Sequence, residues 1–142
     1  VFGLTQKLTR VAEEAGIVKT DDGEFGYSTD GLVNPNYEGD QIISCEGLIE
    51  IKCPVDSVKI RAVLETGDLS EYMHQMQGGM WITGAKWCDF IQYVPDLESV
   101  GNDLFVKRVP RDEKFIEEMS DGLLKFRQRV ADFKYLYSRK AA

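Results

Sequence analysis

The order of patterns along this 142-residue chain predicts an α/β (α+β) domain with a mixed central sheet flanked by helices. A helical pattern is followed by a meander of short strands, a second helix, two more strands and a long amphipathic helix. The composition, 43% hydrophobic and 29% charged, is that of an ordinary globular protein. We therefore expect residues 1–142 to form a single domain around one core.

The first half of the chain reads as one helix and a meander of strands. Apolar residues at helical spacing predict a helix over Leu4–Ala15, which Gly16 ends. β-type residues and turn signals then predict the remaining segments. These are a strand entry at Gly16–Thr20, a turn at Asp21–Gly23, strands at Phe25–Ser28 and Leu32–Val33, a loop at Asn34–Gly39 and a returning strand at Asp40–Glu50.

The second half alternates helices and strands. A short helix or irregular connection is expected over Asp56–Glu65, followed by a helix that Ser70 caps and Gly84 ends. Buried-strand patterns follow at Lys86–Val94 and Asp103–Val109. A long helix then opens at Arg111. Its basic end is either a solvated face or a surface that contacts phosphate or another subunit.

Two features of the Ser70–Thr83 segment point to close packing. Met73, Met76 and Met80 repeat at helical spacing, so we expect them to face the core. Gly78 and Gly79 each cost roughly 1 kcal/mol relative to alanine inside a helix. That cost indicates close approach of another backbone or of a ligand.

Three charged residues form a pattern suited to metal-assisted hydrolysis. If Leu48–Cys53 is a strand, Glu50 and Lys52 share one face, and Pro54 ends the strand. Asp30 lies twenty residues before Glu50, in an Asp-Gly turn. Carboxylates bind a hard divalent cation through oxygen, and a lysine can orient the attacking water. We expect Asp30, Glu50 and Lys52 to converge within about 4–6 Å.

The stretches STDGL and LIEIKCP resemble the signature of the PD-(D/E)XK nuclease superfamily, and more narrowly that of the lambda-exonuclease or YqaJ-like viral recombinase family. The block YMHQMQGGMWIT resembles the family's Y-x-x-Q-x-Q-x-x-M-W-x-T helix, and WCDF and RDEK follow in the family's order. The resemblance runs from about Gly16 to about Val130. It implies a restriction-endonuclease-like core.

The resemblance also implies chemistry. It implies a Mg²⁺-dependent deoxyribonuclease, with Mn²⁺ as a substitute, that acts as a 5′-to-3′ exonuclease in phage recombination. Asp30, Glu50 and the Ile51 backbone carbonyl would hold metal, Lys52 would position and help deprotonate water, and Gln75 would orient Lys52 or the water. Gln77 lies on a different helix face and is the weaker candidate. The implied partners are DNA, a ring-shaped homotrimer and a single-strand annealing protein, in the cytoplasm of the host cell.

Departures from the family keep two alternatives open. Leu4 stands about where the family carries a further glutamate, and the family's N-terminal region with its DNA-end-binding arginine has no counterpart. A structure-selective or nicking endonuclease of the same superfamily therefore remains a rival. The other rival is a non-catalytic DNA- or protein-binding module that retains the fold.

Charge and cysteine content limit the partners. The net charge of −7 is unusual for a DNA-binding protein, so we expect basic groups to gather near the site. The candidate DNA contacts are Lys59, Arg61, Lys107 and Arg108. Three cysteines without C-x-x-C spacing favour free thiols in a reducing compartment. No apolar run approaches the roughly 20 residues that span a bilayer, so no membrane association is expected.

Overall fold

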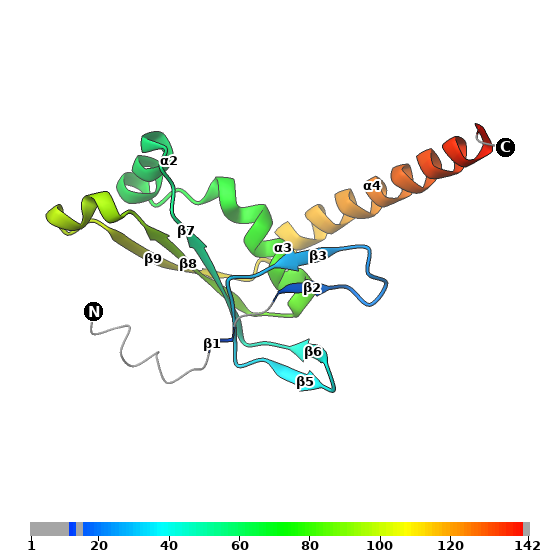
Figure 1. Ribbon diagram of the computed structural model, residues 1–142, viewed down its shortest axis with the longest axis horizontal. Coiled ribbons are helices and arrows are strands. Elements are labelled where there is room, and N and C mark those ends of the chain that lie inside the picture. Colours follow the sequence, from blue (N-terminus) through cyan, green and yellow to red (C-terminus); the bar gives the residue numbers. More distant parts are fainter. Residues whose placement is uncertain (1–11, 14–15, 141–142) are drawn as a thin grey trace. The chain divides into compact units, whose positions relative to one another are not determined.

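The computed structural model describes residues 12–13 and 16–140 (Figure 1). The chain divides after Arg111 into two compact units, and the second of them consists of one long helix. A single domain over residues 1–142 stays a prediction.

A five-stranded mixed sheet forms the frame of the first unit, in the order β1-β4-β7-β8-β9 (Figure 1). Its strands are β1 (Ala12–Glu13), β4 (Gly31–Val33), β7 (Gly47–Lys52), β8 (Trp87–Tyr93) and β9 (Leu104–Pro110). Only β7 and β8 run parallel to each other within this sheet, and its other neighbours are antiparallel. The predicted fold class, a mixed central sheet with helices, is confirmed.

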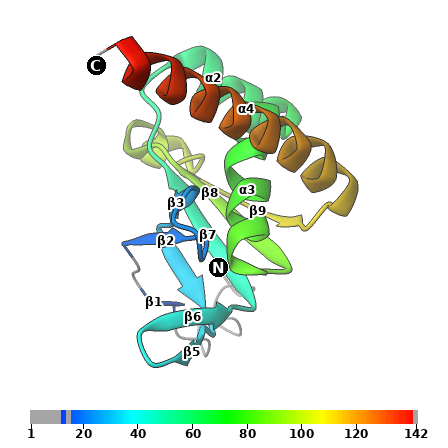
Figure 2. The same ribbon diagram turned by 90° about the vertical axis from the view of Figure 1, so that its right-hand side faces the viewer.

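A helical crossover connects the two parallel strands, because parallel neighbours cannot be joined by a tight turn. It consists of α2 (Ser57–Arg61), the π-helix η1 (Ala62–Thr66), the 3₁₀ turn η2 (Ser70–Tyr72) and α3 (Met73–Thr83). Figures 1 and 2 show α3 lying against the sheet. Met76 and Met80 of α3 join Leu32, Leu48 and Phe90 in one buried cluster, which confirms that the methionine stripe faces the core.

Two hairpins and a short 3₁₀ segment complete the first unit. The hairpins are β2 (Ile17–Lys19) with β3 (Gly26–Ser28), and β5 (Asn36–Glu38) with β6 (Gln41–Ser44). The 3₁₀ segment η3 (Pro95–Val100) joins β8 to β9 and ends at Gly101.

Three sequence predictions in the first half are wrong in part. Ala12–Glu13, placed inside the helix Leu4–Ala15, pair with β4 as an edge strand, and the rest of that prediction lies outside the described residues. The loop Asn34–Gly39 contains strand β5. The strand Asp40–Glu50 is two strands in different sheets. For Ala12–Glu13 and for β7, pairing with strands far along the chain decides the structure, which local patterns do not record, whereas β5 pairs with β6 directly after it.

The helix start at Ser70 also differs from the prediction. Asp68 supplies the capping carboxylate, which accepts a hydrogen bond from the Ser70 N–H at 2.9 Å. Ser70 instead opens the 3₁₀ turn that precedes α3. Gly84 ends α3 at φ 72°, as predicted.

The second unit is α4 (Glu113–Lys140). Asp112 caps it, because its Oδ1 accepts from the Phe115 N–H at 3.0 Å. The Phe133 and Tyr137 rings, one turn apart, stack at 6.5 Å. The predicted long helix is confirmed, but it begins at Glu113, two residues after the predicted start at Arg111.

Candidate active site

The site begins where β7 loses a neighbouring strand. β4 pairs with β7 only over Gly47–Ile49, so the following residues present main-chain groups at an open edge. The Ile51 N–H donates there to Asp30 Oδ2 at 2.7 Å. Both main-chain groups of a strand residue point to the same side, so the Ile51 carbonyl faces the same edge. Asp30 therefore lies at the same end of the sheet as Glu50, as predicted.

Glu50 is the most strongly held side chain of the site. It is 1% exposed, and three donors converge on its carboxylate. The Tyr27 hydroxyl donates to Oε2 at 2.9 Å, and Gln75 Nε2 donates to Oε1 at 2.6 Å. Lys52 Nζ lies 2.5 Å from the same Oε1. A buried carboxylate with this many donors is held in a single orientation.

Lys52 and Gln75 complete the group. Lys52 Nζ donates to Gln75 Oε1 at 3.0 Å and lies 5.8 Å from the centroid of the Tyr72 ring. The Gln75 amide thus bridges the ammonium and the carboxylate, with its oxygen towards Lys52 and its nitrogen towards Glu50. The expectation that α3 points Gln75 at Lys52 is confirmed.

Tyr27 is a member of the site that the sequence reasoning missed. It lies on β3 and is buried, and its hydroxyl is one of the three donors to Glu50. Burial, followed by the nearby Glu50 charge, raises the pKa of Tyr27 far above its ordinary value, so the hydroxyl keeps its proton. The sequence shows only a tyrosine in a β-type stretch three residues before Asp30, and its burial is known from the structure alone.

Gly79 makes room for Tyr27. A Cβ at position 79 would lie 2.6 Å from the tyrosine ring, which is closer than any real contact. At Gly79 the close approach inferred from the helix glycines is thus made by an aromatic side chain, not by another backbone or a ligand.

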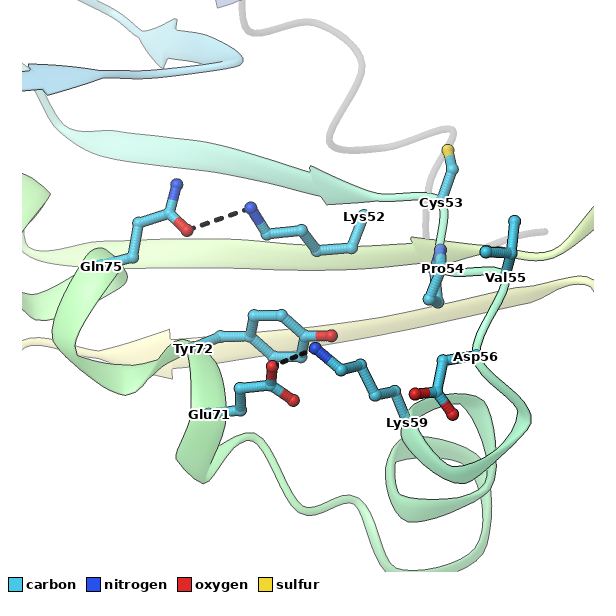
Figure 3. Close-up of a pocket in the computed structure, with 9 residues that line it drawn as sticks. All are labelled: Lys52, Cys53, Pro54, Val55, Asp56, Lys59, Glu71, Tyr72 and Gln75. Carbon is cyan, nitrogen blue, oxygen red and sulfur yellow. Dashed lines mark hydrogen bonds and ion pairs between the residues drawn. The ribbon is translucent and has the colours of Figure 1, made fainter.

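A pocket of about 630 Å³ opens beside Lys52 (Figure 3). Its walls are the end of β7, the start of α2 and the start of α3. The lining residues are Lys52, Cys53, Pro54, Val55, Asp56, Lys59, Glu71, Tyr72 and Gln75. Figure 3 shows Lys59 reaching towards Glu71, with which it forms an ion pair.

Of the four candidate DNA contacts, Lys59 alone is among the residues that line this pocket. Arg61 pairs with Glu65 one turn further along the helix. Lys107 Nζ donates to the Gly67 carbonyl at 3.3 Å. Arg108 makes two bonds of 2.7 Å to Asp89 and lies 3.5 Å over the Trp87 ring. Its hydrogen bond to Asp89 raises the pKa of Arg108.

Other polar residues near the site have structural roles. Gln77 is fully buried and donates to the Pro110 carbonyl at 3.0 Å, on a different face of α3 from Gln75, as expected. Arg111 donates to the Met80 carbonyl near the end of α3. Burial, with the charges of Glu50, Asp89 and Asp30, raises the pKa of the Cys88 thiol.

The oxygen atoms at the open edge of β7 are suitable ligands for a hard divalent cation. Asp30, Glu50 and the Ile51 carbonyl offer oxygen atoms only, which suits Mg²⁺ or Mn²⁺. Within the described part of the chain, no group of three or more His, Cys, Asp or Glu side chains is placed to hold a metal. Any ion at this edge therefore needs main-chain oxygen or water as well as the two carboxylates.

Comparison with known proteins gives the family. Residues 4–86 match the model of the YqaJ-like viral recombinase domain. The chain belongs to this family. A search of curated proteins finds no match.

Two solved structures share the fold. A crystal structure of an alkaline exonuclease from Laribacter hongkongensis is 33% identical with a TM-score of 0.76, and the match covers 99% of this chain and 68% of that one. A second structure, of LHK-Exo in complex with dAMP, is 31% identical with a TM-score of 0.77, and the match covers 99% and 67%. The restriction-endonuclease-like core expected from the resemblance is confirmed.

No helix in the described part of the chain is both long enough and apolar enough to span a membrane.

Proposed function

We propose that this protein is a Mg²⁺-dependent DNA exonuclease of the phage recombination type. The observation that carries the proposal is a cluster at the open edge of β7. There Glu50, Lys52 and Gln75 contact one another, and Asp30 accepts from the Ile51 N–H between Glu50 and Lys52. The family and the similarity to an alkaline exonuclease support it. A scaffold protein would not need a buried carboxylate with three donors beside an exposed-edge aspartate.

Each residue has a distinct part in the proposed reaction. Asp30, Glu50 and the Ile51 carbonyl would hold the ion, which supplies Lewis-acid stabilisation of the phosphate oxygens. Lys52 uses two of its three hydrogens on Glu50 and Gln75, which leaves one for a phosphate oxygen or the attacking water. Gln75 fixes the position of the Lys52 ammonium, and Tyr27 fixes the orientation of Glu50.

The finer features of the proposal come from the family alone. They are 5′-to-3′ polarity, a ring-shaped homotrimer and a single-strand annealing protein as partner. The pocket beside Lys52 is the place where the end of a DNA strand would enter.

The test is cleavage of end-labelled linear duplex, closed circles and nicked circles, with Mg²⁺, with Mn²⁺ and with chelator. We expect metal-dependent release of nucleotides from linear duplex, and a loss of at least about 100-fold in Asp30→Asn and Glu50→Gln. Asp89→Asn is the matched control, because that carboxylate pairs with Arg108 away from the pocket. Cutting of closed circles would favour the endonuclease, and no cleavage with either metal would favour the binding module.

A further inference from the structure

Gln92 is a buried polar residue that the proposed chemistry leaves unused. It lies on β8, is 1% exposed, and stands in register with Lys52 of the parallel strand β7. Residues in register on parallel strands project from the same face, so Gln92 and Lys52 are neighbours on the face that carries Glu50.

One atom of Gln92 has no partner. Its Nε2 lies 3.5 Å from the Ile60 carbonyl of α2, at the limit of a hydrogen bond. Its Oε1 is buried and, among the described residues, accepts no hydrogen bond. Turning the amide over would not help, because it would place oxygen against the Ile60 oxygen. A buried acceptor without a donor is costly, so its retention calls for a function.

The sheet offers one donor for this oxygen. The side chains in register with Gln92 are Lys52 on β7 and Phe105 on β9. Only the lysine carries hydrogens that it can donate. In this structure its ammonium is directed to Glu50 and Gln75. Its flexible stem and third hydrogen allow it to reach another acceptor.

We propose that Gln92 is a positioning residue whose Oε1 is a second acceptor for the Lys52 ammonium, used when a cation engages Glu50. This rests on the proposed function, because it assumes that Glu50 binds metal. When the Glu50 carboxylate binds the cation, the Lys52 ammonium keeps its hydrogen bond to Gln75 Oε1 and forms a second one to Gln92 Oε1. The ammonium is then held by two neutral amide oxygens and remains able to face the water or phosphate.

The proposal predicts that one variant, Gln92→Met, loses activity without losing stability. Gln92→Met keeps the volume but removes the unpaired oxygen, so the melting temperature in chelator should rise or stay level. At saturating DNA the Mg²⁺-supported turnover should fall about 10-fold, with KM unchanged. Gln77→Met is the matched control: that amide is equally buried but bonded to Pro110, so melting should drop and turnover should hold.

A second measurement does not depend on cleavage. The Gln92 side-chain amide is followed by ¹⁵N NMR during titration with Ca²⁺. We expect its resonances to shift in the wild-type chain and to stay in place in Lys52→Met. If DNA is not cleaved but this pattern appears, the proposed function fails while the Gln92 contact stands.

Two results would overturn the proposal. One is a Gln92→Met variant that loses stability and keeps full turnover, as a purely structural glutamine would. The other is a Gln92 signal that ignores Ca²⁺ or shifts equally in Lys52→Met. Equal shifts would indicate that a buried water, and not Lys52, donates to Gln92 Oε1.

Discussion

Glu50 depends on its neighbours more than any other residue of the site. Its carboxylate is buried, so its charge is tolerable only because Tyr27, Lys52 and Gln75 all donate to it. These donors come from three separate elements, β3, β7 and α3. The site therefore forms only when the whole first unit is folded.

The Tyr27 hydroxyl can be tested by removing one oxygen atom. Tyr27→Phe keeps the ring against Gly79 but withdraws a donor from a buried carboxylate. We expect the free energy of unfolding to fall by about 1.5–3 kcal/mol, measured by urea denaturation. Metal-dependent cleavage should fall as well. Tyr93→Phe, on a partly exposed tyrosine of β8, should change neither quantity; equal losses in both variants would exclude a specific role for Tyr27.

Stability should decline at alkaline pH because three buried groups, Tyr27, Cys45 and Cys88, resist ionisation. The pKa values of Cys88 and Tyr27 are raised chiefly by burial. A raised folded-state pKa gives stability that is complete below the unfolded-state value and is lost as pH rises above it. The loss should begin near pH 8.5 for Cys88 and near pH 10 for Tyr27.

The measurement is the free energy of unfolding from pH 7 to 11. Cys88→Ala should reduce the slope that starts near pH 8.5, to which Cys45 also contributes, and Tyr27→Phe should reduce the slope near pH 10. Each variant lowers the whole curve through lost packing or hydrogen bonding, so the slopes are the quantity to compare. A wild-type curve that stays flat to pH 11 would contradict the assignment.

The sequence predicts the residues of this site that share one strand, but not those that join it only through contacts in the folded protein. Glu50 and Lys52 share a strand face by simple alternation, and that was predictable. The Tyr27 hydroxyl and the Gln92 oxygen matter only through contacts with other elements. Nothing in the residues beside them in the chain records those contacts.

At the scale of elements, α3 is shaped by what lies against it. Alanine favours helix over glycine by roughly 1 kcal/mol, yet a Cβ at Gly79 would overlap the Tyr27 ring. We expect Gly79→Ala to lower the free energy of unfolding by about 1–3 kcal/mol, and to reduce cleavage by displacing the donor to Glu50. Chemical denaturation and single-turnover cleavage measure the two effects.

Gly122→Ala in α4 is the comparison for that variant. Apart from the neighbouring backbone of its own helix, nothing lies within 4 Å of a Cβ built at Gly122, so only the helix propensity should act there. We expect α4 to gain about 1 kcal/mol. If Gly79→Ala raised the free energy of unfolding by a similar amount, the Tyr27 ring would have to move aside at no energetic cost, which would contradict the prediction.

Among the elements that the sequence misplaced, β1 and β7 depend on distant pairing, whereas β5 and β6 form a local hairpin. The run from Asp40 to Glu50 is β-rich throughout, but β6 pairs with β5 while β7 joins the central sheet. The Glu46 N–H between them bonds to the Val33 carbonyl at 2.9 Å. By contrast α3 carries a methionine stripe and the Gly84 end signal, and α4 carries an amphipathic pattern that begins after Asp112, so their existence was predictable.

At the scale of the whole molecule, the net charge of −7 sets the expected DNA affinity. Several cations of the first unit are already paired, among them Lys59, Arg61 and Arg108. Lys52 and Lys59 are the cations that line the pocket, and about two phosphates would be neutralised when each exchanges its carboxylate partner for phosphate. The logarithm of the binding constant should then fall with the logarithm of salt with a slope of about −2.

The check is binding of end-labelled duplex with Ca²⁺ in place of Mg²⁺, across a salt series. Lys59→Gln should reduce the slope by about 1, whereas Arg61→Gln, on the same helix but outside the pocket, should leave it unchanged. Tight binding by the isolated chain with almost no salt dependence would contradict the expectation, as would equal effects of the two variants.

The three cysteines differ in exposure, which allows selective chemical labelling of the pocket. Cys45 and Cys88 are buried, and burial raises the pKa of both thiols, whereas Cys53 is exposed on the pocket wall next to Lys52. Because the thiolate is the reactive form, a maleimide dye should label the native chain at Cys53 alone. Peptide mapping of the labelled protein would check this. The folded chain thus carries its own single attachment point, from which a fluorophore could report, in real time, each arrival and departure of a DNA end.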